Sequence, residues 1–128
     1  MKNSLIRVFV LMIFMVFLLS LSATAQDLEK KYAPILGNYE FDLTDLGMGV
    51  VTVKFYVEND ELWAWPDNAD EPGLMVPVED EEFMFTVDAG DQGVYELEFM
   101  KEESGKYTKC RVKNEAIAMD VIGEKIIE

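Results

Sequence analysis

The stretch "GVVTVKFYV", residues 49–57, constrains the fold more than any other part of the chain. Its side chains alternate between two faces, one apolar and one mostly polar. The apolar face holds Val51, Val53, Phe55 and Val57, and the opposite face holds Thr52, Lys54 and Tyr56. A period of two is typical of a β-strand that buries one face. The stretch therefore predicts a strand with a hydrophobic core on one side.

The same pattern recurs along the chain and predicts an all-β fold. Short turns rich in Asp, Asn, Gly and Glu separate the apolar stretches, as tight antiparallel connections require. Further strands are predicted at 36–42, 62–65, 75–79, 83–87, 94–100, 107–113 and 116–122. About eight such strands in up-and-down order predict a small antiparallel barrel, with a sandwich as the alternative. "DLEKKYAP", at 27–34, predicts a short helical turn before the first strand.

The first 25 residues have the three-part pattern of a secretory signal peptide. Lys2 and Arg7 precede the apolar run "VFVLMIFMVFLL", and Ala23-Thr24-Ala25 provides the small residues of a cleavage site. The apolar run is shorter than the roughly 20 residues of a membrane-spanning helix. We expect a secreted or periplasmic protein without a stable membrane anchor after cleavage, with residues 26–128 forming one β-barrel domain.

The net charge limits the classes of partner that this domain can bind, and the single cysteine limits how the domain can be stabilised. Residues 26–128 contain nine basic and 25 acidic residues, a net charge of −16, which disfavours nucleic acid as a partner. An acidic surface also supports solubility. Cys110 is the single cysteine, so we expect no internal disulfide, and its place in an alternating stretch predicts a small buried side chain.

The residue types that build common catalytic sites are scarce in this sequence. There is no histidine, and after residue 25 the single serine is Ser104, in a predicted turn. Nucleophilic catalysis needs an activated nucleophile with a base, and zinc sites commonly use His and Cys. A hydrolase based on paired carboxylates would need two of them facing each other across a cleft. Because the carboxylates lie mostly in predicted turns, we expect no enzyme activity.

Several short motifs give the chain a family resemblance. "YAPILGNYEF", "ENDELWAW", "LMVPVEDEEFMF" and "YELEFMKEESGKY" occur in that order between Tyr32 and Val112. They resemble the small lipocalin-like domain at the C-terminus of serine hydrolases of the beta-lactamase and penicillin-binding type. The positions that carry the resemblance are Gly37, Tyr39, Leu62, Pro77, Phe83, Phe99 and Gly105. The resemblance implies an eight-stranded barrel acting as an accessory module rather than a catalyst. Within residues 1–128 no hydrolase domain precedes these motifs, so we do not expect that accessory role to carry over directly.

The stretch "ELWAWPDNADEPG", at 61–73, contains the leading candidate for a binding surface. If Leu62 faces the core, as the resemblance implies, alternation places Trp63 and Trp65 together on the outer face. Exposed aromatic side chains often mark a partner or ligand surface. We therefore expect Trp63, Trp65 and Tyr56 to contact a protein partner or a small apolar ligand. If the indoles point inward instead, they fill the barrel.

An acidic loop follows the tryptophans and provides the alternative hypothesis. Asp67, Asn68, Asp70 and Glu71 supply four oxygen-bearing side chains within five residues, and calcium prefers such ligands. Their spacing matches no EF-hand loop. The sequence predicts a module without a cofactor, and calcium stabilisation is the alternative.

If the loop binds calcium, added calcium will raise the melting temperature of the domain and a chelator will abolish that rise. A ligand that binds only the folded state stabilises it by about 2.7 kcal/mol at a concentration 100 times its Kd. For a domain of this size, that corresponds to a shift of several degrees or more. An unchanged melting temperature in calcium and in chelator would remove the calcium hypothesis.

Overall fold

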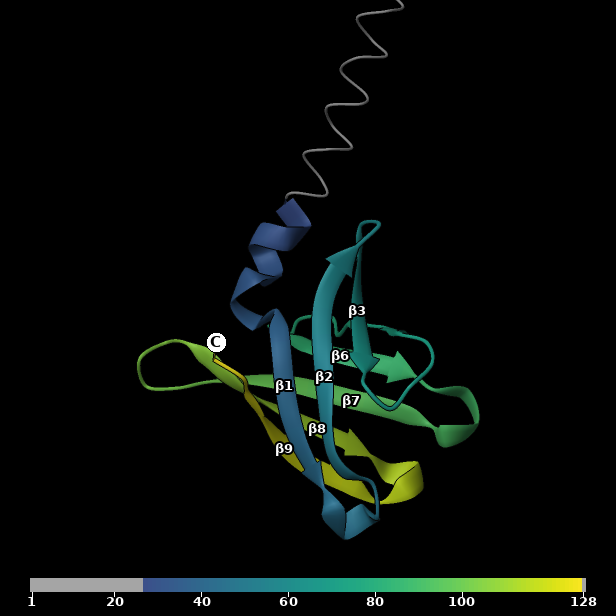
Figure 1. Ribbon diagram of the computed structural model, residues 1–128. Helices are drawn as coiled ribbons and strands as arrows, with labels where there is room; N and C mark the ends of the chain where they lie inside the picture. Colours follow the sequence, from purple (N-terminus) through teal and green to yellow (C-terminus); the bar gives the residue numbers. More distant parts are fainter. Residues whose placement is uncertain (1–26, 128) are drawn as a thin grey trace, which may run out of the picture.

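The computed structural model describes residues 27–127, which form a single strongly curved β-sheet beside a short N-terminal helix (Figure 1). An α-helical segment covers residues 27–32, and a 3₁₀ turn at Ala33–Ile35 connects it to the first strand. The predicted signal peptide lies outside the described residues. Within 27–127, no helix combines the length and the apolar character that spanning a membrane would require.

Nine strands build the sheet. They are β1 (Gly37–Leu43), β2 (Gly49–Glu58), β3 (Glu61–Pro66), β4 (Gly73–Leu74), β5 (Val76–Pro77), β6 (Met84–Asp88), β7 (Val94–Lys101), β8 (Tyr107–Asn114) and β9 (Met119–Lys125). Every pair of hydrogen-bonded neighbours is antiparallel. The order across the sheet is β4-β3-β2-β1-β9-β8-β7-β6-β5. Because β1 pairs with β9, the first and last strands join and the sheet becomes a nearly closed up-and-down barrel.

The two edges of this sheet belong to one short segment of chain. β4 pairs with β3 and β5 pairs with β6, and Met75 alone separates β4 from β5. The segment Gly73–Pro77 therefore crosses from one edge to the other, and together β4 and β5 correspond to one strand of an eight-stranded barrel. The backbone N–H of Met75 donates to the carbonyl of Leu62, which adds a further bond to β3. The predicted barrel, with about eight strands, is thus confirmed, and the sandwich alternative is not observed.

One end of the barrel interior is packed with aromatic side chains. Tyr39, Phe55 and Phe99 are nearly or fully buried, and their rings meet edge to face with centroids 5.0–5.6 Å apart. Tyr32, from the N-terminal helix, packs against Phe85, and Ile35 beside it is fully buried. Such edge-to-face contacts add stability beyond the burial of area alone. The N-terminal segment thus covers this end of the barrel, which we call the closed end.

Two glycines allow close approach inside the barrel wall. At Gly123 in β9, a Cβ atom would lie 2.5 Å from the ring of Phe41 in β1. At Gly73 in β4, a Cβ atom would lie 2.6 Å from a methyl group of Val87 in β6. The contact at Gly123 lies between the first and last strands, and the contact at Gly73 lies between β4 and β6. Both therefore occur where the sheet closes on itself. Small residues at these positions let the barrel close without distorting its wall.

The predicted strands agree with the structure except at two places. The predicted strand 75–79 is split at Met75 and forms β4 and β5 two residues earlier than expected. The last strand was predicted at 116–122 but runs from Met119 to Lys125. The side chain of Asn114 caps a 3₁₀ turn at Glu115–Ile117, and Ala118 then adopts a left-handed conformation with φ of 53°. The four residues "AIAM", at 116–119, are all apolar. The alternation pattern therefore predicted a strand here and did not reveal the turn.

Gly123→Ala is expected to destabilise the domain by about 1–3 kcal/mol, because the new methyl group overlaps the Phe41 ring. Urea denaturation measures the change in the free energy of unfolding. The double variant Gly123→Ala/Phe41→Leu removes the ring and should lose less stability than the two single variants added together. Strict additivity would show that the two residues do not meet as described.

Candidate functional site

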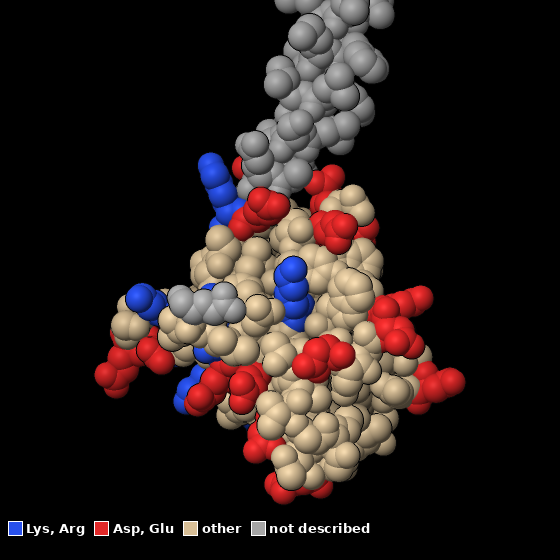
Figure 2. Space-filling model, viewed as in Figure 1, with Lys and Arg blue, Asp and Glu red and all other residues tan. Residues whose placement is uncertain are grey.

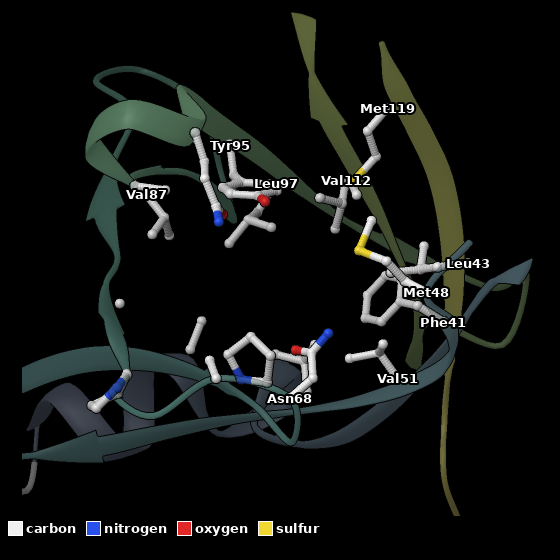
Figure 3. Close-up of a pocket in the computed structure, with 18 of the residues that line it drawn as sticks. Phe41, Leu43, Met48, Val51, Asn68, Val87, Tyr95, Leu97, Val112 and Met119 are labelled. Atoms are coloured by element: carbon white, nitrogen blue, oxygen red, sulfur yellow. The ribbon is translucent and has the colours of Figure 1, made fainter. Parts of the chain in front are cut away.

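The half of the barrel opposite the closed end contains a cavity of about 560 Å³. Side chains from every long strand project into it, and Figure 3 shows the labelled residues surrounding an open space. Its apolar walls include Phe41, Leu43, Val51, Ala64, Val87, Leu97, Val112 and Met119. Cavities that hold small molecules in proteins commonly measure about 300–1,000 Å³ and have mostly apolar walls. The size and lining suit one small organic molecule.

The cavity exists because side-chain size changes along the barrel axis. Tyr39, Phe55 and Phe99 occupy the closed end, whereas on the same three strands Leu43, Val51 and Leu97 occupy the other half. Ala64 in β3 adds a further small side chain to the lining of the cavity. An eight-stranded barrel is just wide enough for side chains to fill it or for one small ligand to enter. Here the end packed with Tyr39, Phe55 and Phe99 is filled, and the half that contains Leu43, Val51 and Leu97 is not.

Exposed residues from three connecting segments surround the entrance to the cavity. Met48 follows the turn after β1, Asn68 and Glu71 belong to the loop after β3, and Asp88 and Gln92 flank the turn after β6. All five line the cavity and are also exposed to solvent. We call these five residues the mouth. In an up-and-down barrel these connections lie at the same end, because each long strand reverses the direction of the chain.

The loop 67–72 closes part of the cavity wall between β3 and β4. Asn68, Ala69, Glu71 and Pro72 all line the cavity, and the amide of Asn68 points into it (Figure 3). The backbone N–H of Asp67 donates to the carbonyl of Thr52 at 2.8 Å. The indole Nε1–H of Trp65 donates to the carbonyl of Ala69 at 3.0 Å. These two bonds attach the loop to β2 and β3.

The predicted aromatic surface lies on the outside of the barrel. Leu62 and Ala64 are buried and face inward, so Trp63 and Trp65 face outward, and Trp63 lies opposite Tyr56 across β2 and β3. Trp65 is 42% exposed, and Trp63 is half-buried. The Nε1–H of Trp63 donates to the carbonyl of Glu58 at 3.0 Å. Because each indole N–H already has a backbone partner, these residues offer a partner mainly the faces of their rings.

The four residues of the calcium hypothesis share one loop without converging. Asn68 and Glu71 line the cavity, whereas Asp67 and Asp70 do not. Across residues 27–127, no three His, Cys, Asp or Glu side chains form a group that could hold a metal ion. Calcium binding by this loop stays a prediction. The arrangement favours solvated carboxylates at the rim of the barrel, since charged side chains in exposed loops are well hydrated.

Two buried groups lie near each other at the closed end. Cys110 is fully buried, as the sequence predicted, and burial raises the pKa of its thiol above the usual range. Burial also raises the pKa of the Tyr39 hydroxyl, with Cys110 as the second cause, and this oxygen has no hydrogen-bond partner in the part of the chain described. A raised pKa keeps the thiol protonated and therefore a poor nucleophile. These residues pack the core.

Acidic side chains outnumber basic ones over the face of the domain shown in Figure 2. Within residues 27–127, the structure contains one ion pair, between Arg111 and Asp120 on the outer face, with N and O atoms 2.8 Å apart. Each partner shifts the other, so the pKa of Asp120 is lowered and the pKa of Arg111 is raised. Both side chains are well exposed, and such pairs contribute little stability.

The cavity is the part of the site that sequence reasoning missed. Alternation identified its wall residues as core, because a side chain that lines a cavity and one that fills the core have the same period. The available signal was the change from Tyr39 to Leu43 along β1 and from Phe99 to Leu97 along β7. That signal becomes interpretable only once the strand register is known.

Comparisons with family models, with curated proteins and with solved structures each return no match. The resemblance to the lipocalin-like domain therefore remains an expectation from the motifs.

Trp65→Phe is expected to loosen the loop 67–72 while leaving the barrel folded. The substitution removes the bond to Ala69, and a hydrogen bond of this kind contributes about 0.5–1.5 kcal/mol. Hydrogen exchange should become faster at the amides of Asp67 and Ala69 and stay unchanged in β8. Trp63→Phe is the matched control, because it removes the bond to Glu58 at the opposite end of β3. Equal exchange at Asp67 and Ala69 in all three proteins would contradict this role of Trp65.

Proposed function

We propose that this protein is a non-catalytic binding module that holds one small apolar molecule inside its barrel. The observation that carries the proposal is the cavity of about 560 Å³ with mostly apolar walls and an exposed mouth. Moving apolar surface from water into such a cavity is favourable by about 25 cal/mol per Å². A cavity formed by rigid strands also avoids much of the ordering cost of binding.

The surroundings of the cavity support binding rather than chemistry. Its polar lining residues are Asn68, Glu71, Asp88, Gln92 and Tyr95, and the two acidic residues among them are exposed to solvent. Nucleophilic catalysis needs an activated nucleophile with a base, and no Ser, Thr, Cys, Lys or His is among the described residues that line the cavity. The proposal includes export, supported by the pattern of residues 1–25, so that the module would bind its ligand in a secreted or periplasmic location.

A protein partner at the outer aromatic surface is the second candidate. The observation that favours it is that Trp65 in β3, Leu74 in β4 and Val76 in β5 are apolar and 42%, 41% and 50% exposed. Aromatic residues are enriched in protein interfaces. We place this candidate second, because both indole N–H groups are already bonded within the chain.

Adjacent residues on opposite faces of β3 distinguish the two sites. Ala64 faces the cavity and Trp63 faces outward, so Ala64→Leu fills the cavity and Trp63→Ala removes part of the outer surface. Nile red, a neutral apolar dye, should become fluorescent with the parent protein. We expect Ala64→Leu to weaken dye binding at least about tenfold, equivalent to about 1.4 kcal/mol, and Trp63→Ala to change it less than about twofold.

Thermal unfolding of both variants serves as the folding control. Loss of dye binding in Trp63→Ala with normal binding in Ala64→Leu would move the ligand site to the outer aromatic surface. Absence of dye binding by the folded parent protein would overturn the cavity proposal.

A further inference from the structure

Met48 is the one residue of the mouth with an apolar side chain, and it is 43% exposed. Five methionines follow residue 25, and all of them lie within residues 27–127. Met75 and Met119 are buried, and Met84 and Met100 are half-buried. Because an oxidant in solution reacts first with accessible sulfur, Met48 is the methionine that it reaches most easily.

The side chain of Met48 also forms part of the cavity wall. It lines the cavity, and Figure 3 shows it beside Leu43 and Phe41 at the edge of the open space. The backbone N–H of Met48 donates to the carbonyl of Leu43 at 3.1 Å, which anchors the residue next to the pairing of Leu43 with Gly49. A flexible thioether at this place can contact a ligand in the entrance while its other side meets water.

We propose that oxidation of Met48 to its sulfoxide is a modification that weakens ligand binding in the cavity. The oxidant is hydrogen peroxide. The thioether sulfur attacks one peroxide oxygen, the O–O bond breaks, a sulfur–oxygen bond forms and water leaves. The sulfur is thereby oxidised and the peroxide is reduced. This inference rests on the proposed function, because it concerns the same cavity.

The modification replaces an apolar contact at the entrance with a polar one. Methionine sulfoxide is polar, whereas the thioether is apolar. Burying a polar group without a hydrogen-bond partner is costly, so the oxidised side chain will stay hydrated instead of covering an apolar ligand. A threefold loss of affinity is what the loss of roughly 25 Å² of apolar contact would produce.

The other sulfur atoms near the barrel interior are better protected. Cys110 is fully buried, and burial raises the pKa of its thiol, which keeps it protonated and poorly reactive. Met119 lines the cavity as well but is only 6% exposed. The proposed export, supported by the pattern of residues 1–25, would take the protein into oxidising surroundings, where such a modification can occur.

Mass spectrometry of peptides tests where the protein is oxidised. The parent protein is treated with dilute hydrogen peroxide, with and without saturating Nile red, and the peroxide is then removed. We expect the peptide that contains Met48 to gain one oxygen atom before the peptides that contain the other four methionines. Bound dye should slow this oxidation, because the ligand covers the sulfur, and should leave the oxidation of Met84 unchanged.

Titration with Nile red tests the effect on binding. Oxidation should raise the Kd of the parent protein for the dye at least about threefold. Treatment with methionine sulfoxide reductases of both epimer specificities should restore the original Kd. Reversal by these enzymes would show that the loss comes from a sulfoxide and not from irreversible damage.

Three variants assign the effect to one residue. Met48→Leu keeps an apolar side chain without sulfur, so its Kd should be the same before and after peroxide. Met48→Gln places a polar side chain of similar length at the entrance and should weaken dye binding without peroxide. Met84→Leu is the matched control, because it removes a half-buried methionine that does not line the cavity, and it should keep the parent's response to peroxide.

The possible outcomes separate this inference from the proposed function. If the parent protein binds the dye and oxidation of Met48 leaves the Kd unchanged, the cavity proposal stands and the inference is wrong. If Met48→Leu loses affinity after peroxide as the parent does, another residue is responsible and the assignment to Met48 is wrong. Oxidation of another methionine before Met48 would contradict the inference as well. If the folded parent protein binds no dye, the proposed function itself fails.

Discussion

Pairing between the first and last strands determines the shape of this protein. β1 and β9 meet through Tyr39 opposite Lys125 and Glu40 opposite Glu124, and the N–H of Ile126 extends the contact to the carbonyl of Asn38. Without this pairing, the sheet would expose two unpaired edges, which favour aggregation. An open sheet would also not enclose a barrel interior. The contact joins segments more than 80 residues apart, so its formation costs loop-closure entropy that the shared core must offset.

Closure alone would produce a filled barrel, and the distribution of side-chain size is what leaves room inside. The N-terminal segment and the cluster of Tyr39, Phe55 and Phe99 seal one end. Smaller side chains line the other end and leave the cavity open toward the mouth. A stable packed end and an open end thus coexist on the same strands, since packing at one end holds the walls of the other in place.

A hydrogen bond from Trp65 links the outer surface of the barrel to a loop of the cavity wall, and the spacing of the tryptophans did not indicate this bond. Trp65 faces outward, yet its indole holds the carbonyl of Ala69, which belongs to the cavity wall. Part of the aromatic surface therefore supports the loop that encloses the interior. Of the acidic residues of that loop, Glu71 lines the cavity, whereas Asp67 and Asp70 do not.

Alternation and turn residues act over a few neighbouring positions, so the amino-acid sequence was enough to predict most of the strands, but it left open whether Leu62 or the two tryptophans of β3 face inward. It misplaced the start of β9, since the left-handed residue Ala118 lies within an apolar stretch that resembles a strand. The pairing of β1 with β9, the single crossing segment formed by β4 and β5, the inward position of Leu62 and the open half of the barrel became known from the folded chain alone. These features depend on which distant residues become neighbours, and a local pattern contains no such information.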